Sequence, residues 1–166
     1  FNKINTGMLI YNRNLSVCPL TTHVPIKLVS KKISKKLIQD KLKLINEFYF
    51  KNFNFKPRIG VTGLNPHCES VSKFNEDVKI VLPAIKNSQK KNIFAYGPYS
   101  AETIFLKQNR VKFDVILGMY HDQVLSPLKT LCEYDAINIT MGLPFLRVSP
   151  DHGPNEKMIN KNSSNP

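Results

Sequence analysis

The chain has 166 residues, 42% of them hydrophobic, which suits one domain with a core and is too short for two large domains. Its net charge of +12 comes mostly from scattered lysines, so it favours a compositional bias over a nucleic-acid-binding stripe. No apolar run approaches the roughly twenty residues of a membrane span, and three cysteines without a Cys-x-x-Cys pair indicate neither a disulfide framework nor a thiolate zinc site. We therefore expect a cytoplasmic protein without nucleic-acid or membrane partners.

The first half of the chain predicts short strands followed by one long helix. Two prolines bracket a loop around His23, and Ser30 is the expected N-cap of an amphipathic helix to about Phe50 whose lysines form a solvated face. A later Gly/Asn/Pro loop carries His67 directly after a buried strand, where α/β proteins often place ligand groups. We predict the strands of this half at 8–11, 15–18 and 58–63.

The second half alternates the same two kinds of element. We expect helices at 73–87, where Pro83 must kink or reset the helix, from Ser100 to Phe105, and at 125–131. The expected strands are 93–96, followed by a Gly97-Pro98 turn, 114–118 and 137–141, with mostly loop from Gly142 onward. This alternation predicts a layered α/β fold with a largely parallel sheet flanked by helices. Residues 1–159 should form one α/β unit, and 160–166 a flexible end.

The stretch from Met119 to Gly153 is unusually rich in groups that carry chemistry. Lys129 and Arg147 flank the apolar strand-like run 136–141, so a rigid element would present both cations to one anion. A phosphorylated or carboxylated substrate fits such a pair. The same stretch also contains His121, Asp122, Asn138 and His152.

Three histidines, His23, His67 and His121, each lie in a loop near the end of a predicted strand. Neutral imidazole is a common ligand of zinc and similar divalent ions, and three such ligands leave positions open for substrate oxygen atoms. Their long separations match no local zinc signature. From spacing alone, a shared metal site and isolated histidines both stay open.

Several blocks, in this order, carry a resemblance to a known family. They are Thr-Thr-His-Val-Pro at 21–25, Gly-Leu-Asn-Pro-His at 63–67, Gly-Pro at 97–98 with Ala-Glu-Thr at 101–103, Met-Tyr-His-Asp-Gln at 119–123, Asn-Ile-Thr-Met-Gly-Leu-Pro-Phe-Leu-Arg at 138–147 and Asp-His-Gly at 151–153. The chain resembles the 4-hydroxythreonine-4-phosphate dehydrogenase family of pyridoxal phosphate biosynthesis, with a fold like that of isocitrate and isopropylmalate dehydrogenases. The match suggests the later half of that family's chain, and the start at Phe1 also suggests a fragment, which we expect to be inactive alone.

The resemblance implies a homodimeric enzyme with its site near the subunit interface. Such an enzyme uses a divalent metal (Zn, Mg, Mn or Co) and NAD or NADP to oxidise 4-phosphohydroxy-L-threonine, and decarboxylation to 3-amino-2-oxopropyl phosphate follows. His23, His67 and His121 match the family's metal ligands. Its substrate-binding residues are matched by Lys129, Asn138 and Arg147.

Further roles follow with less support from the motifs. Lys129 is a candidate proton carrier, and Asp122 is a weaker catalytic candidate. His152 and Gly153 look like the His-Gly turn with which related dehydrogenases hold the nucleotide, an analogy at the level of the fold. The chain also departs from the family: a segment without glycine follows His67, and Glu102 stands where the family commonly has Asp.

Two other classes of function stay open from the sequence. The charge and the lysine-rich helix also suit a basic nucleic-acid-binding module, which would bind with a steep dependence on salt. Three histidine ligands alone also suit a metal-dependent hydrolase or lyase on a similar sheet.

Overall fold

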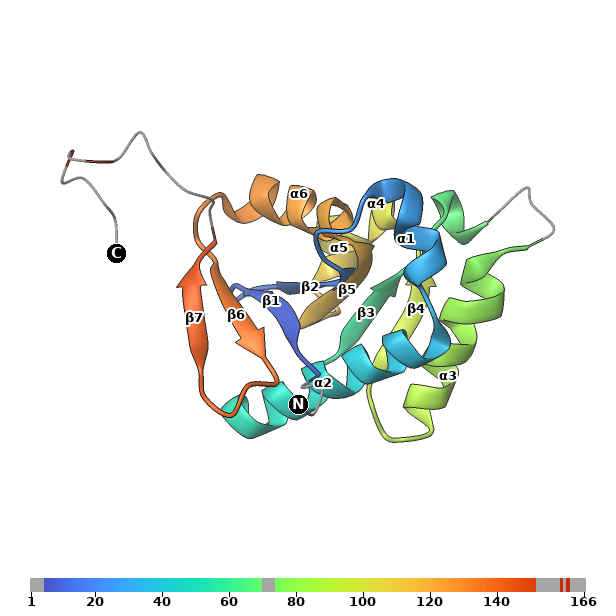
Figure 1. The fold of residues 1–166 in the computed structure, drawn as a ribbon, viewed down its shortest axis with the longest axis horizontal. Helices are drawn as coiled ribbons and strands as arrows, with labels where there is room; N and C mark the ends of the chain where they lie inside the picture. The colour runs from blue at the N-terminus through green and yellow to red at the C-terminus, as the bar shows by residue number, and fades with distance from the viewer. Residues whose placement is uncertain (1–4, 70–73, 152–158, 160, 162–166) are drawn as a thin grey trace.

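A computed structural model describes residues 5–69, 74–151, 159 and 161. They form a seven-stranded sheet in the order β4-β3-β5-β2-β1-β6-β7, with helices on both faces (Figure 1). The layered α/β architecture predicted from the sequence is confirmed. The strands are β1 (Gly7–Tyr11), β2 (Ser16–Thr21), β3 (Ile59–Thr62), β4 (Ala95–Tyr99), β5 (Val115–Tyr120), β6 (Ile137–Met141) and β7 (Arg147–Pro150).

The sheet has a parallel core and an antiparallel end. β2, β5, β3 and β4 pair in parallel, with β5 between β2 and β3. β1 pairs antiparallel with both β2 and β6, and β6 pairs antiparallel with β7. The expectation of a largely parallel sheet therefore holds for the core, and the sheet as a whole is mixed.

One face of the sheet is covered by α1 (Ile26–Lys32), α2 (Lys35–Phe53) and α3 (Leu82–Gln89), which follows the π-helical turn η2 (Asp77–Val81). Figure 1 shows α2 running across this face. Ile38, Leu42 and Ile45 of α2 are fully buried in the same cluster as side chains of β3 and β5. Each contributes about 1.5–3 kcal/mol by leaving water, so the apolar stripe of α2 fixes the helix on the sheet.

The other face is covered by α4 (Ala101–Ile104), α5 (Lys107–Arg110) and α6 (His121–Cys132). Val124 and Leu128 of α6 pack in one buried cluster with Ile10 and Ile116. A Cβ at Gly118 would lie 2.3 Å from Cγ1 of Val124, so the glycine allows α6 to approach β5 closely. This close packing places the first residue of α6 beside the end of β5.

The long helix expected from Ser30 is two helices. Ile33 is extended between them, and the side chain of Ser34, not of Ser30, caps α2 by accepting from the backbone N–H of Leu37 at 3.2 Å. The expected solvated lysine face is wrong at Lys41, which is buried and donates to the carbonyl of Thr6 at 3.0 Å. The amphipathic pattern was therefore right, and the boundary was wrong.

Other boundaries also moved. The expected Gly97-Pro98 turn lies inside β4 and contains a cis peptide bond, and Ser100 precedes α4 without a capping side-chain bond. Helix α6 begins at His121 and not at 125, and β7 occupies part of the segment expected to be loop. In the range 73–87 expected to be a helix, residues 74 and 75 are not helical, η2 begins at Asp77, and the regular helix restarts around Pro83 as predicted. Most of the expected flexible end lies outside the described residues.

None of the helices in the described part of the chain combines the length and the apolar character that crossing a bilayer requires.

Candidate metal and anion site

The three histidines follow three neighbouring strands. His23 lies just after β2, His67 lies in the short 3-10 helix η1 (Pro66–Cys68) after β3, and His121 directly follows β5 as the first residue of α6. Since β3, β5 and β2 are adjacent and parallel, their carboxyl ends lie at one edge of the sheet. This edge is where open α/β sheets bind ligands.

Two of the three imidazoles lie side by side. The ring centroids of His23 and His121 are 5.8 Å apart, with 38° between the ring planes. His67 has a different neighbour, because its Nδ1 lies 3.0 Å from Oε1 of Glu102. Among residues 5–69 and 74–151, no three His, Cys, Asp or Glu side chains are grouped so that they could hold a metal ion. The described chain therefore brings His23 and His121 together and leaves His67 outside a closed cluster.

In two of these histidines, a carboxylate oxygen lies close to the Nδ1 atom of the ring. Nδ1 of His121 lies 2.7 Å from Oδ1 of Asp122, and Glu102 holds Nδ1 of His67 in the same way. A carboxylate that accepts from Nδ1 fixes the tautomer in which Nδ1 carries the proton. The lone pair of Nε2 is then free to bind a metal ion, the arrangement typical of metal-ligating histidines. The donor chemistry thus fits a divalent cation, and Asp122 contacts the imidazole of His121.

The loop before His67 is held by a buried carboxylate that the sequence analysis missed. Asp77 is fully buried and accepts from the backbone N–H of Leu64 at 2.6 Å, and from the backbone N–H and side-chain amide of Asn65 at 3.0 and 3.1 Å. A Cβ at Gly63 would lie 2.7 Å from Sγ of Cys68, so any larger residue here would force the Cys68 side chain to move. In the sequence, Asp77 looked like an ordinary acidic residue near the start of a predicted helix, and nothing indicated that it would hold this loop.

A second missed residue is Gln123, one position beyond the His-Asp pair. Its side chain is bonded to the ends of both β3 and β5. Its place in the Met-Tyr-His-Asp-Gln block was the available signal. A glutamine two residues after a ligand candidate, however, looks like any polar helix residue.

The predicted substrate-binding residues share the face of the sheet that α6 covers. Asn138 lies opposite Ile10, whose side chain packs against α6. Oδ1 of Asn138 is buried and has no hydrogen-bond partner among the described residues, so a free acceptor faces this side. Arg147 is exposed on β7, and its Nη1 donates to Oγ1 of Thr140 across the strand pair at 2.9 Å.

Lys129 is already engaged in an ion pair. Its ammonium lies 2.8 Å from Oδ2 of Asp151, also donates to the Asp151 carbonyl, and lies 5.5 Å from the ring centroid of Tyr134. Lys129 follows His121 on α6 by about two turns, which is roughly 12 Å along the axis. The backbone of Lys129 is therefore set back along α6 from the histidine edge. The nucleotide candidates His152 and Gly153 lie outside the described residues.

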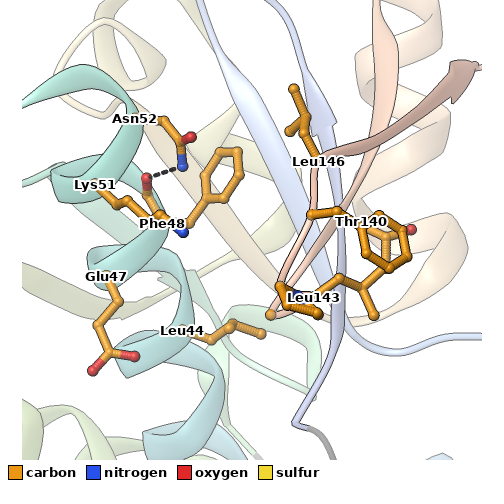
Figure 2. Close-up of a pocket in the computed structure, with 11 residues that line it drawn as sticks. Leu44, Glu47, Phe48, Lys51, Asn52, Thr140, Leu143 and Leu146 are labelled. Atoms are coloured by element: carbon orange, nitrogen blue, oxygen red, sulfur yellow. Dashed lines mark hydrogen bonds between the residues drawn. The ribbon is translucent and has the colours of Figure 1, made fainter.

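A hollow of about 200 Å³, lined by both polar and apolar residues, lies between α2 and the turn that joins β6 to β7 (Figure 2). Leu44 and Phe48 of α2 face Leu143 and Leu146 of the turn across it. None of the predicted site residues lines it. It adjoins Arg147 through Thr140, which lines it and accepts from the Arg147 side chain.

Comparisons with known proteins point to one family. The family model described as pyridoxal phosphate biosynthetic protein PdxA matches residues 1–166. A 4-hydroxythreonine-4-phosphate dehydrogenase of Sulfurihydrogenibium sp. is 43% identical over 96% of this chain and 50% of its own length. A D-threonate 4-phosphate dehydrogenase of Salmonella typhimurium is 37% identical, with 89% of this chain and 45% of its own length covered.

A solved structure gives the same result. The crystal structure of a 4-hydroxythreonine-4-phosphate dehydrogenase from Klebsiella pneumoniae has a TM-score of 0.82 and 34% identity, covering 93% of this chain and 47% of that one. The chain thus spans about half the length of the relatives it matches. The matches confirm the expected family and do not support the expectation that the chain is its later half.

Proposed function

The chain belongs to the PdxA family of pyridoxal phosphate biosynthetic proteins, and on that premise we propose that the protein it represents is a 4-hydroxythreonine-4-phosphate dehydrogenase. Its reaction would be the oxidation of 4-phosphohydroxy-L-threonine by NAD or NADP, followed by decarboxylation to 3-amino-2-oxopropyl phosphate. The observation that carries the proposal is the approach of His23 and His121, 5.8 Å apart between ring centroids, at the carboxyl edge of a parallel core.

His23, His67 and His121 would hold a divalent cation, Zn, Mg, Mn or Co. When bound, the cation would polarise the alcohol oxygen and then the ketone oxygen of the substrate. Support comes from the carboxylates of Glu102 and Asp122, which lie against Nδ1 of His67 and His121 and leave the lone pair of Nε2 in each ring for the cation. Asp122 acts here by orienting His121.

The other predicted residues would bind the substrate. Arg147 and Lys129 offer positive charge for its phosphate and carboxylate, and the unpartnered Oδ1 of Asn138 accepts from a donor such as its ammonium group. In the reaction, hydride passes to the nicotinamide while the hydroxyl proton is lost. The bond to the carboxylate then breaks, carbon dioxide leaves, and the remaining carbon takes up a proton. Lys129 would carry one of these protons after releasing Asp151.

The nucleotide contacts and the subunit arrangement complete the proposal. We propose that His152 and Gly153 contact the nucleotide and that the enzyme is a cytoplasmic homodimer with its site near the subunit interface. Support for a shared site is that the described residues bring together two of the three histidines and leave the ligand set open. A membrane or nucleic-acid partner is not expected, since the lysines are scattered and one of them, Lys41, is buried.

The test uses the full-length protein, stripped of metal with a chelator. Reduced nicotinamide is followed by absorbance after addition of one metal at a time, NAD or NADP, and 4-phosphohydroxy-L-threonine, with D-threonate 4-phosphate as the comparison substrate. We expect reduction that needs metal and prefers the hydroxythreonine phosphate. Preference for D-threonate 4-phosphate would reassign the substrate. Metal-dependent phosphate release without nicotinamide reduction would favour a hydrolase, and salt-sensitive nucleic-acid binding would favour the basic module.

A further inference from the structure

The side chain of Gln123 connects two strand ends to the start of α6. Its Oε1 accepts from Oγ1 of Thr62 and from the backbone N–H of Met119, both at 2.7 Å. Its Nε2 donates to the carbonyl of Gly63 at 2.8 Å. One amide group thus satisfies a hydroxyl, a backbone donor and a backbone acceptor on two different strands.

These bonds begin where the backbone ladder stops. The parallel pairing of β3 with β5 runs through Ile59, Gly60 and Val61 on β3, and the last pair joins Val61 to Leu117. Thr62, Gly63 and Met119 lie beyond that pair. The amide of Gln123 therefore connects the two strands over the residues that lead directly into the loops of His67 and His121.

The third strand is tied to the same point. Oγ1 of Thr21, the last residue of β2, donates to the carbonyl of Met119 at 2.8 Å and is buried. Met119 therefore bonds to Gln123 through its N–H and to Thr21 through its carbonyl. The ends of β3, β5 and β2, each followed by one of the three histidines, are joined through this residue.

We propose that Gln123 is a positioning residue for the metal centre, which holds the His67 loop in register with His121 without touching the cation. The inference rests on the metal site of the proposed function. Glutamine suits the role because its amide offers an acceptor and a donor at once. A glutamate has the same shape and would still accept from Thr62 and Met119. Its second oxygen, however, would replace the N–H donor and repel the carbonyl of Gly63.

The test measures zinc affinity and thermal unfolding of the full-length protein, without substrate or nucleotide. Zinc affinity is obtained by competition with a chromophoric chelator for Gln123→Glu, Gln123→Ala and Thr62→Val. Gln89→Ala is the matched control, since Nε2 of Gln89 on α3 donates to the carbonyl of Ala95, the first residue of β4, at 2.7 Å. That bond lies at the opposite end of the parallel strands.

We expect both Gln123 variants to bind zinc about 10- to 100-fold more weakly, the size seen when groups that orient metal ligands are removed. Gln89→Ala should bind zinc within about twofold of wild type, although its metal-free Tm falls by a similar amount. Should Gln123→Ala fail to fold, Gln123→Glu and Thr62→Val carry the test, and both should weaken zinc binding.

Two results would overturn the inference. If wild type binds zinc through His121 and the Gln123 variants bind it equally tightly while their Tm falls, Gln123 serves stability alone and the metal site stands. If wild type binds none of zinc, cobalt, manganese and magnesium, the metal site itself fails, and the inference fails with it. The nicotinamide assay on wild type is independent of both results, so the two proposals can be judged separately.

Discussion

The imidazole rings of His23 and His121 lie 5.8 Å apart between centroids, although His23 lies in a loop after β2 and His121 begins α6 after β5. The parallel pairing of β2 with β5 explains the approach. Thr21 pairs with Tyr120 in that register, and each histidine follows its strand within two residues. A shift of this register would separate the two rings, so the histidine pair depends on correct strand pairing.

Replacing His121 should remove metal-dependent turnover without unfolding the protein. In His121→Ala, the loss of the imidazole takes away one donor, while Val124 and Leu128 still anchor α6 in the core. We expect no detectable nicotinamide reduction, with circular dichroism and Tm close to wild type. Lys107→Ala, at an exposed position on α5, is the control and should keep full activity. Unchanged turnover in His121→Ala would refute the site assignment.

Arg147→Ala should chiefly weaken substrate binding. Arg147 is exposed and makes one described side-chain bond, to Thr140, so its removal should leave the fold intact. A charged hydrogen bond to a substrate anion is worth about 1.5–3 kcal/mol, which predicts a KM about 10- to 100-fold higher. Steady-state kinetics measure this, with Arg13→Ala as an exposed arginine control. A KM equal to that of wild type would exclude anion binding by Arg147.

Lys129→Arg separates charge from proton transfer. Arginine keeps the positive charge and its ion pair with Asp151, but it does not release a proton at ordinary pH. If Lys129 carries a proton, kcat should fall about 10²- to 10⁴-fold while KM changes little. Lys129→Met, which also loses the charge, should raise KM in addition. Normal kcat in Lys129→Arg would leave Lys129 with an electrostatic role only.

Gly118→Ala should destabilise the protein through the contact between β5 and α6. The added Cβ would lie 2.3 Å from Cγ1 of Val124, so strand and helix must move apart. Overpacking of this kind costs about 1–3 kcal/mol in the free energy of unfolding, measurable by urea titration. Because Val124→Ala removes the clashing atom, the double variant should lose less than the sum of the two single losses. Additive losses would show that the destabilisation by Gly118→Ala does not come from its contact with Val124.

Stability should decline in alkaline solution because of Cys18. Burial raises the pKa of the Cys18 thiol from 9.0 to about 12, since the thiolate is disfavoured away from water. Between these values the unfolded chain has lost the proton and the native one has kept it. The free energy of unfolding should therefore fall as pH rises above 9, by up to about 1.4 kcal/mol per pH unit. In Cys18→Ala, urea titrations from pH 7 to pH 10.5 should show a shallower decline.

The sequence predicted that each histidine lies near the end of a strand, whereas the spacing left open whether the three rings share one site. Buried apolar runs predicted strands ahead of His67 and His121, and parallel strands place their ends at one edge. The separation of the rings did not follow, since loop conformation depends on Asp77 and Gln123, whose partners are distant in sequence. Those contacts form only in the folded chain.

Helix and strand boundaries failed where local signals were ambiguous. Ser30 and Ser34 are equally good N-caps by type, and the extended backbone of Ile33 between them is set by packing. Strand β7 was missed because its side chains show no clean alternation in burial and its pairing with β6 is its defining feature. The burial of Lys41 depended on the nearby carbonyl of Thr6.

Strand β5 lies between β2 and β3, although it follows both in the chain. While the ribosome has delivered only the residues before Val115, β2 has no ladder to β3, and the loops with His23 and His67 sit on pieces that are not yet joined. On the proposed function, the ligand set would therefore assemble only once β5 has paired with β2 and β3, and metal uptake would report when the centre of the sheet has closed.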